Sequence, residues 1–257
     1  MQNPFQNAMS QLDKVAKIKN FDNEFIARLR QPDRDIRISI PIKMDNGSLK
    51  IFEGYRVEYN NALGPYKGGV RYHQDTEINE VKALAFWMVL KCAVAGIPMG
   101  GGKGGITVNP KELSKEELER LSRGWVQKLS DILGPRKDVP APDVNTTPEI
   151  MDWMNDEYQK ITGDKTGAMI TGKPLEKGGS EGRGTATAQG GFFVFETLIN
   201  ACVNFIRRGS GGNEYRLVNL FRKFFKFKRA VVQRAWKPES VVYQSLLARA
   251  VSVIHSI

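Results

Sequence analysis

Lys103 stands inside a cluster of five glycines, in the stretch PMGGGKGGI that runs from Pro98 to Ile106. Glycine lets the backbone approach a ligand closely or adopt dihedral angles that other residues avoid. A phosphate-binding P-loop needs Gly-Lys followed by Ser or Thr. Here Gly104 follows the lysine, and Ile97 stands where the first glycine of that loop belongs. The spacing therefore excludes a P-loop.

The same glycines match the spacing G-x-G-x-x-G at Gly100, Gly102 and Gly105. A dinucleotide-binding fingerprint follows a strand and opens a helix, so that the helix N-terminus faces the pyrophosphate. Here a helical pattern precedes the glycines and the strand-like ITV follows them. This reversed order leaves three interpretations open, a phosphate site, a plain glycine turn and a lysine displayed for chemistry, of which we favour the last.

Two further lysines support that interpretation. Lys91 is the lone charged residue between Ala83 and Ala95, so we expect this half of a helix to be buried and its ammonium to need a carboxylate or a polar pocket. A lysine that snorkels near the helix end is the alternative. Lys67 lies between Gly64-Pro65 and Gly68-Gly69, in a second glycine-framed setting that we expect to be a loop.

Asp143 lies in the proline-rich stretch VPAPDVNT, which we interpret as a stiff connector, although a solvated turn aspartate is an equally plain interpretation. Burial and neighbouring cations would lower the pKa of Lys103 toward neutrality, so that it can exchange protons at working pH. Three lysines and one acid fit a dicarboxylate substrate with a proton-transfer pair. His73 and His255 have no metal-ligand spacing, so we expect no metal, and we expect Cys92 to belong to the core.

The elements that must position these residues alternate between helix and strand. We expect helical segments up to about Arg30, then two strands around a tight turn at DNG, then a helix capped by Thr76 that ends at Gly96. Further helices begin at Ser114, which has a capping box with Glu117, and at Thr147, which precedes Pro148. The pattern predicts an α/β fold with a single mixed sheet and flanking helices. Residues 167–191 look like a glycine-rich linker or ligand-binding loop, and FFVFETLIN after them like a buried helix.

Composition and charge restrict the function classes. The chain has 257 residues, 41% of them hydrophobic, and no stretch long enough for a membrane span. The N-terminus lacks the apolar region of a signal peptide, so we expect a cytoplasmic protein. Residues 201–257 hold 11 of the 38 Lys and Arg residues but two of the 28 acidic residues, so nearly all of the net charge of +10 belongs to that tail.

Four stretches carry a resemblance to a known family: GPYKGGVRYH, LKCAVAGIPMGGGKGGI, VPAPDVNT and GGSEGRGTATAQGG. In their order along the chain and in their amino-acid sequence they resemble the amino-acid dehydrogenases that act on glutamate, leucine, phenylalanine and valine, and the glutamate dehydrogenases in particular. The resemblance covers roughly residues 10–200. It implies NAD- or NADP-dependent oxidative deamination of L-glutamate to 2-oxoglutarate and ammonia, by a homo-oligomer that is usually a hexamer.

The resemblance also implies a role for each site residue. Lys67 would hold the side-chain carboxylate of glutamate, and Lys91 the α-carboxylate. Lys103 would be the catalytic lysine that activates water, and Asp143 the acid that carries protons to and from the substrate nitrogen. The remaining residues that the resemblance implies are Met88 and Gly68 at the substrate and Thr187 near the nicotinamide.

The family pattern ends near residue 200. We expect a substrate-binding and dimerisation domain over residues 1–185, the start of a dinucleotide-binding domain over 186–200, and a non-homologous basic tail over 201–257. In RRGSGGNEYR, Glu214 occupies the third glycine position of a fingerprint. A reading-frame shift near residue 200 would explain this tail, and a chain without the nucleotide domain is expected to transfer little hydride on its own.

The alternative is a non-catalytic oligomerising or glutamate-sensing domain whose tail binds nucleic acid or membranes. Out-of-frame codons readily give the same basic composition, so we expect neither nucleic acid nor a membrane as a partner.

Overall fold

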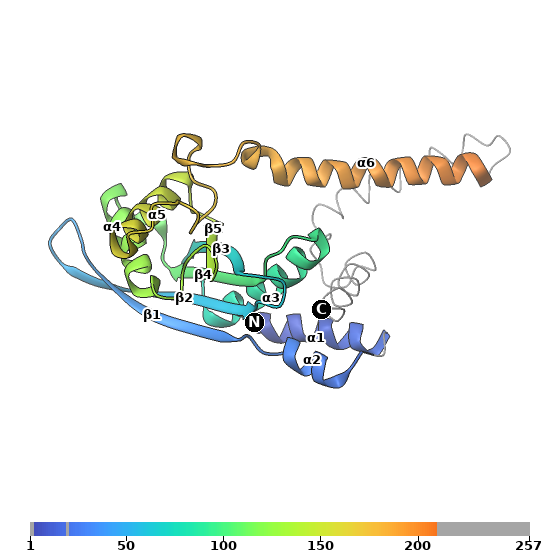
Figure 1. The fold of residues 1–257 in the computed structure, drawn as a ribbon, viewed down its shortest axis with the longest axis horizontal. Helices are drawn as coiled ribbons and strands as arrows, with labels where there is room; N and C mark the ends of the chain where they lie inside the picture. Colours follow the sequence, from blue (N-terminus) through green and yellow to red (C-terminus); the bar gives the residue numbers. More distant parts are fainter. Residues whose placement is uncertain (1–2, 19–20, 210–257) are drawn as a thin grey trace. The chain divides into compact units, whose positions relative to one another are not determined.

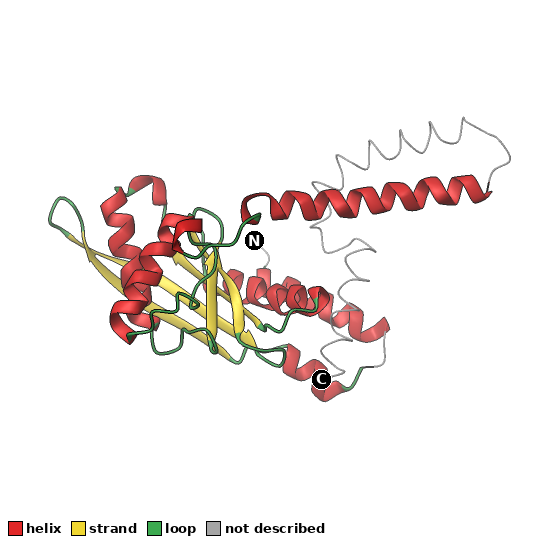
Figure 2. Ribbon diagram, turned by 45° about the horizontal axis from the view of Figure 1, so that its top comes forward, coloured by secondary structure: helices red, strands yellow, loops and turns green. Residues whose placement is uncertain are grey.

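The computed structural model of the protein describes residues 3–18 and 21–209. These residues form two compact units, the first ending at Ser180 and the second beginning at Glu181. The first unit is built on a five-stranded sheet (Figures 1 and 2). The strands are β1 (Arg34–Lys43), β2 (Leu49–Asn60), β3 (Tyr66–His73), β4 (Gly101–Thr107) and β5 (Asp138–Pro142).

The sheet is mixed, with the order β1-β2-β4-β3-β5. Strands β1 and β2 pair antiparallel, as do β2 and β4, whereas β3 pairs parallel with both β4 and β5. Parallel pairs need a long crossover, and the helices between these strands provide it. The expected α/β fold with a single mixed sheet and flanking helices is confirmed.

Helices cover both faces of the sheet. One face carries α3 (Ile78–Ala95), with α1 (Pro4–Ile18) packed against it, and α2 (Asn23–Leu29) follows α1 in the chain. The other face carries α4 (Lys115–Leu129), which packs against β1 and against α5 (Pro148–Thr162) (Figure 1). Two short 3-10 helices lie at Pro110–Glu112 and Leu175–Lys177.

An apolar cluster lies on the α4 and α5 side of the sheet. It includes Trp125 of α4, a fully buried side chain whose indole N–H donates to the carbonyl oxygen of Tyr55. Residues from β1, β3, β4, α4 and α5 contribute the surrounding side chains, among them Ile40, Val70, Ile106, Leu121 and Met154. This core packs against one face of the sheet. The lysine side chains of β3 and β4 lie on the opposite face.

Local signals set most of the helix ends as expected. Ser114 and Glu117 form both hydrogen bonds of a capping box, and Thr147 accepts from the backbone N–H of Ile150. Gly96 ends α3 in the left-handed region with φ of 66°. The expected cap at Thr76 was wrong. The side chain of Glu77 accepts from the backbone of Asn79 and Glu80 and begins α3 instead.

Three segments that we expected to be loops are strands. The GPYKGGVRYH stretch contains β3, the glycine cluster forms β4 itself, and VPAPDVNT begins within β5. Glycine and proline are disfavoured in strands, so local propensity argued against all three. Pairing within the sheet outweighs that propensity, because each segment has a neighbour on at least one side.

The second unit begins with α6 (Arg183–Gly209), which is continuous through the GTATAQGG stretch that we expected to be a loop. The helix expected at FFVFETLIN is therefore present, but Phe192 and Phe193 are each 59% exposed rather than buried. The basic tail expected over residues 201–257 lies outside the described residues from residue 210 onward, and the reading-frame shift proposed near residue 200 stays a prediction. None of the helices in the described ranges is both long and apolar enough to cross a bilayer.

Candidate active site

The side chains of Lys103 and Asp143 meet above the sheet. Lys103 lies in the middle of β4 and Asp143 directly after β5, and the Lys103 Nζ donates to Asp143 Oδ2 at 2.6 Å. The lysine side chain is 6% exposed and the aspartate side chain 22%. The site is therefore a nearly buried ammonium against a carboxylate that remains open to solvent on one side.

This environment changes the proton affinity of both groups. Burial lowers the pKa of Lys103 to about 8, and the carboxylate of Asp143 opposes that shift. Burial would raise the pKa of Asp143, but the charges and hydrogen bonds of Lys103 and Arg71 together outweigh burial and lower that pKa. Near neutral pH a part of the Lys103 population is a free amine beside an ionised carboxylate, which is an arrangement suited to proton transfer.

The loop after β5 holds Asp143 in place. The backbone N–H of Asp143 donates to the hydroxyl of Thr146 at 2.7 Å, and that hydroxyl donates to the carbonyl oxygen of Val70 at 3.0 Å. Asn145 adopts the left-handed region with φ of 58°, which asparagine tolerates, and its amide donates to the carbonyl oxygen of Tyr72. The loop is thus fastened to β3, so that the carboxylate stays over the sheet.

Lys67 lies on β3, which pairs with β4, the strand that carries Lys103. Its Nζ lies 2.9 Å from the hydroxyl of Thr171 and 3.3 Å from the carbonyl oxygens of Val139 and Pro140. Val70 pairs with Gly104, so Gly69 is the β3 neighbour of Lys103 and lies two residues beyond Lys67. Two residues of strand span about 7 Å, which is close to the length of a five-carbon dicarboxylate.

Helix α3 brings Lys91 and Met88 to the same place. The positive charges of both Lys67 and Lys91 act on the thiol of Cys92, which is buried and has a raised pKa. Lost hydration lowers the pKa of Lys91, and the carboxylate of Asp143 opposes this shift. A Cβ on Gly68 would lie 3.3 Å from the Cγ of Met88 and would overlap with the carbonyl oxygen of Gly102.

The structure therefore brings together six of the seven residues singled out in the sequence: Lys67, Gly68, Met88, Lys91, Lys103 and Asp143. The expectation of a buried Lys91 was wrong, because the end of α3 is open to solvent and Lys91 is exposed. Thr187 is exposed on α6 in the second unit, which is described by itself. No cluster of three or more potential metal ligands occurs among the described residues.

Sequence reasoning missed two arginines at this site. Arg71 lies two residues after Gly69 on β3 and donates from Nε to Asp143 Oδ2 at 2.9 Å. Arg56 on β2 is fully buried with Asp138, donating from Nε to Oδ2 at 2.6 Å and from Nη1 to the carbonyl oxygen of Gly68 at 3.1 Å. The alternation of Lys67, Gly69 and Arg71 on one strand face was the available signal for Arg71, whereas the Arg56–Asp138 pair has no local signal.

The glycines of β4 are packing positions. A Cβ on Gly101 would overlap with Val89 of α3, and one on Gly105 would lie 2.6 Å from Thr76. On the opposite face, a Cβ on Gly104 would lie 3.0 Å from Trp125 and 3.2 Å from Arg56. The glycines therefore let α3 lie close on the sheet and leave room for Arg56 beneath it.

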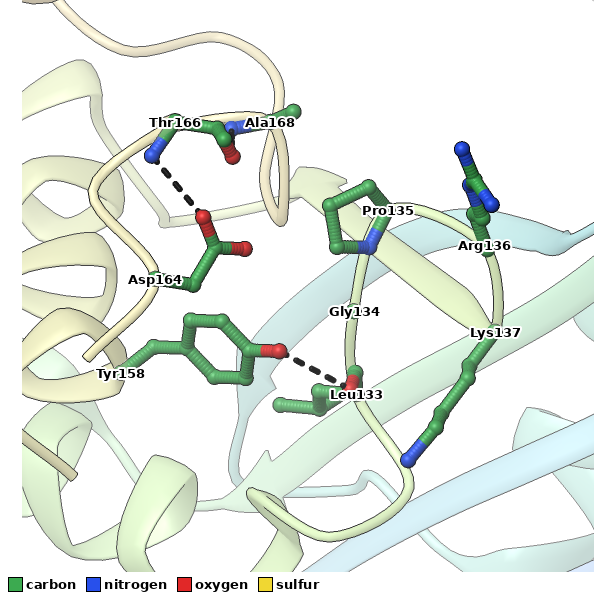
Figure 3. Close-up of a pocket in the computed structure, with 9 residues that line it drawn as sticks. All are labelled: Leu133, Gly134, Pro135, Arg136, Lys137, Tyr158, Asp164, Thr166 and Ala168. Carbon is green, nitrogen blue, oxygen red and sulfur yellow. Dashed lines mark hydrogen bonds between the residues drawn. The ribbon is translucent and has the colours of Figure 1, made fainter. Parts of the chain in front are cut away.

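A separate hollow of about 370 Å³ lies at the other end of β5, between the segment Leu133–Lys137 and the segment that follows α5 (Figure 3). Three of its polar side chains are already engaged by the protein. Tyr158 donates to the carbonyl oxygen of Leu133, Asp164 accepts from the backbone of Thr166, and Lys137 donates to the carbonyl oxygen of Asp131. The hollow includes none of Lys67, Lys91 and Lys103, so the candidate active site is the Lys103–Asp143 cluster.

Comparisons with known proteins show the family to which the chain belongs. Residues 32–160 match the family model described as the Glu/Leu/Phe/Val dehydrogenase dimerisation domain. An NAD-specific glutamate dehydrogenase of Clostridioides difficile is 52% identical over 188 residues, which are 73% of this chain and 45% of that protein. An NADP-specific glutamate dehydrogenase of a Synechocystis strain is 49% identical over 195 residues, which are 76% of this chain and 46% of that protein.

Among solved structures, a hetero-hexameric glutamate dehydrogenase from Thermus thermophilus, in a form described as Leu bound, superposes with a TM-score of 0.76. Its sequence is 37% identical, and the match covers 82% of this chain and 50% of that chain. The chain thus spans about half the length of the relatives that it matches. The match over 32–160 includes β3, β4 and the loop that carries Asp143, and on this basis the chain belongs to the Glu/Leu/Phe/Val dehydrogenase family.

Proposed function

We propose that this chain supplies the substrate-binding and proton-transfer groups of an L-glutamate dehydrogenase. The observation that carries the proposal is the contact between Lys103 and Asp143, with the charges of Lys67 and Lys91 beside it. Three cations and one acid suit an amino acid that carries two carboxylates. The relatives named above are glutamate dehydrogenases, which favours glutamate among the substrates of the family.

Substrate binding is assigned to the two lysines at the rim. The Lys67 ammonium, held by the Thr171 hydroxyl, pairs with the side-chain carboxylate of glutamate, and Lys91 pairs with the α-carboxylate. Ammonium–carboxylate hydrogen bonds of this kind are stronger than neutral ones. Gly68 and Met88 form the wall between them, and the closeness of Gly68 to Gly102 requires a residue without a Cβ.

Proton transfer is assigned to the central pair. As a free amine, Lys103 accepts the proton of a water molecule that adds to the α-carbon, and its pKa of about 8 makes that form available near neutral pH. Asp143 exchanges a proton with the substrate nitrogen, which leaves as ammonia. The NAD or NADP cofactor, when bound, accepts the hydride from the α-carbon.

The glycines of β4 do not form a dinucleotide-binding fingerprint. Gly100, Gly102 and Gly105 have the fingerprint spacing, but Gly102 and Gly105 lie inside β4 and are covered by neighbouring residues. No hydride step is therefore assigned to these glycines. Thr187 is proposed to lie near the nicotinamide, within a dinucleotide-binding segment that begins near residue 186. The two relatives differ in their specificity for NAD and NADP, so either cofactor fits the proposal.

Oligomer formation is part of the proposal. The family description names a dimerisation domain, and the Thermus relative is a hetero-hexamer. We propose that residues 1–185 carry the contacts for a homo-oligomer, a hexamer in the complete enzyme. Light scattering of the purified chain measures this directly, and a monomer at high protein concentration would contradict it.

Calorimetric titration tests the substrate assignment without requiring a cofactor. The chain is titrated with 2-oxoglutarate and with 2-oxopentanoate, which has a methyl group in place of the distal carboxylate. Replacing Lys67→Met is expected to weaken 2-oxoglutarate binding about tenfold or more, because a charge-assisted hydrogen bond is lost. Binding of 2-oxopentanoate should not change. Lys160→Met, which removes an exposed lysine from α5, is the matched control. Equal binding of both ligands by the unaltered chain would overturn the assignment.

A further inference from the structure

Arg71 is the second cation on the carboxylate of Asp143. It lies on β3, on the same face as Lys67 and Gly69, and is 21% exposed. Its Nε lies 2.9 Å from Asp143 Oδ2, and its Nη1 lies 2.5 Å from Oε1 of Glu80 on α3. The guanidinium therefore connects the loop after β5 to the first turns of α3.

The two cations share one oxygen. Lys103 Nζ and Arg71 Nε both donate to Oδ2 of Asp143, at 2.6 Å and 2.9 Å. Within the described ranges no hydrogen bond reaches Oδ1 of this carboxylate. A guanidinium is always charged and its donors point in fixed directions, so together with Lys103 it holds the position of Oδ2. Oδ1 is thereby left as the oxygen that can exchange a proton with a ligand.

We propose that Arg71, anchored by Glu80, is a positioning residue that holds Oδ2 of Asp143 against Lys103 and presents Oδ1 to the substrate nitrogen. The role in catalysis rests on the proposed function. The positioning itself is a property of the unliganded chain. This positioning role differs from that of a plain structural ion pair between β3 and α3. It requires that the effect of Asp143 on the pKa of Lys103 depend on Arg71.

The charges around Asp143 give the expected directions. Lys103 faces it from β4, Arg71 from β3 and Lys91 from α3, while Glu80 on α3 faces Arg71. The positive charge of Arg71 lowers the pKa of Asp143 and opposes the protonated form of Lys103. Without that charge, the pKa of Lys103 should therefore rise.

The test measures Lys103 in the whole chain without ligand. Trace acetic anhydride acylates free amines, and mass spectrometry of the peptide that holds Lys103 gives its reactivity at each pH. In the unaltered chain the midpoint is expected near pH 8. Arg71→Gln should raise it by about one unit or less, within the range for a neighbouring charge. Arg71→Lys should restore much of the midpoint, and Arg123→Gln, which removes an arginine paired with acids on α4 and α5, should leave it unchanged.

A double-mutant cycle separates positioning from charge alone. Asp143→Asn removes the anion from Lys103 and should lower the midpoint. If Arg71 positions the carboxylate, this downward shift is smaller when Arg71→Gln is already present, since the carboxylate is then less well placed to act on Lys103. Glu80→Gln, which keeps the arginine charge, should reduce the same shift to a lesser extent and serves if Arg71→Gln does not fold.

The positioning role would be overturned by one result. In it, Asp143→Asn shifts the midpoint of Lys103 acylation by the same amount with and without Arg71→Gln, and with and without Glu80→Gln. This result is distinguishable from a failure of the proposed function. A chain that binds no dicarboxylate in the titration would contradict the substrate assignment, yet the acylation midpoints of the unliganded chain would still report whether Arg71 positions Asp143.

Discussion

The Nζ of Lys103 lies 2.6 Å from Oδ2 of Asp143, although the two residues are 40 positions apart in the chain. The contact depends on β3, β4 and β5 running parallel, because this arrangement places the loop after β5 beside the middle of β4. We propose that this pair transfers protons while Lys67 and Lys91 hold a dicarboxylate.

The first prediction concerns the pKa of Lys103. Burial lowers that pKa to about 8, and the carboxylate of Asp143 keeps it from falling further. Asp143→Asn should therefore lower the midpoint of Lys103 acylation below pH 8. The pH dependence of trace acetylation measures it. A midpoint that rises or stays constant would show that the carboxylate does not stabilise the ammonium.

The second prediction concerns ligand binding against pH. Lysines bind carboxylates when protonated, and the pKa of Lys103 is about 8 while that of Lys91 is also lowered. Affinity for 2-oxoglutarate should therefore fall as pH rises from about 7 to about 9, because the positive charge of Lys103 is lost in that window. Calorimetry at several pH values measures it. Constant affinity across the window would mean that the charge of Lys103 does not contribute to binding.

The third prediction concerns the fully buried pair of Arg56 and Asp138. Asp138→Asn leaves the arginine charge buried without its anion, which is expected to cost about 3–5 kcal/mol of unfolding free energy. Urea unfolding measures the loss. Lys160→Met breaks the exposed pair with Asp156 and should change stability by less than about 1 kcal/mol. Equal effects of the two changes would argue against a structural role for the buried pair.

The fourth prediction concerns the close approach of α3 to β4. A Cβ on Gly101 overlaps with backbone and side-chain atoms of Val89, which cannot move without shifting the helix. Gly101→Ala should lower the unfolding free energy by about 1–3 kcal/mol. Gly190→Ala, on α6 with open space around it, should not lower stability, since alanine favours helix. Thermal unfolding compares the two, and a stable Gly101→Ala chain would contradict the packing role.

Local signals in the sequence predicted much of the framework. The alternation on both sides of DNG gave the hairpin of β1 and β2, and the Ser114–Glu117 spacing gave the start of α4. Such features depend on residues within a few positions of each other. The helix at Thr76 was placed one residue early, because Glu77 also carries side-chain oxygens that can cap.

Features that depend on distant pairing were not predictable in the same way. The strand β4 consists largely of glycine, and its strand conformation comes from its neighbours β2 and β3. Arg56 and Asp138 are 82 positions apart, so no local pattern joins them. The three lysines and Asp143 were identified because glycines, prolines and an apolar helix set each of them apart from an ordinary surface charge.

The most direct measurement for the central claim is ligand protection of the lysines. The chain is acetylated to a trace level with and without 2-oxoglutarate, and the labelling of each lysine is quantified by mass spectrometry. We predict protection of Lys67, Lys91 and Lys103 together, with Lys160 on α5 unaffected. Labelling of the three lysines that is the same with and without ligand, at a concentration where binding is saturated, would contradict the account.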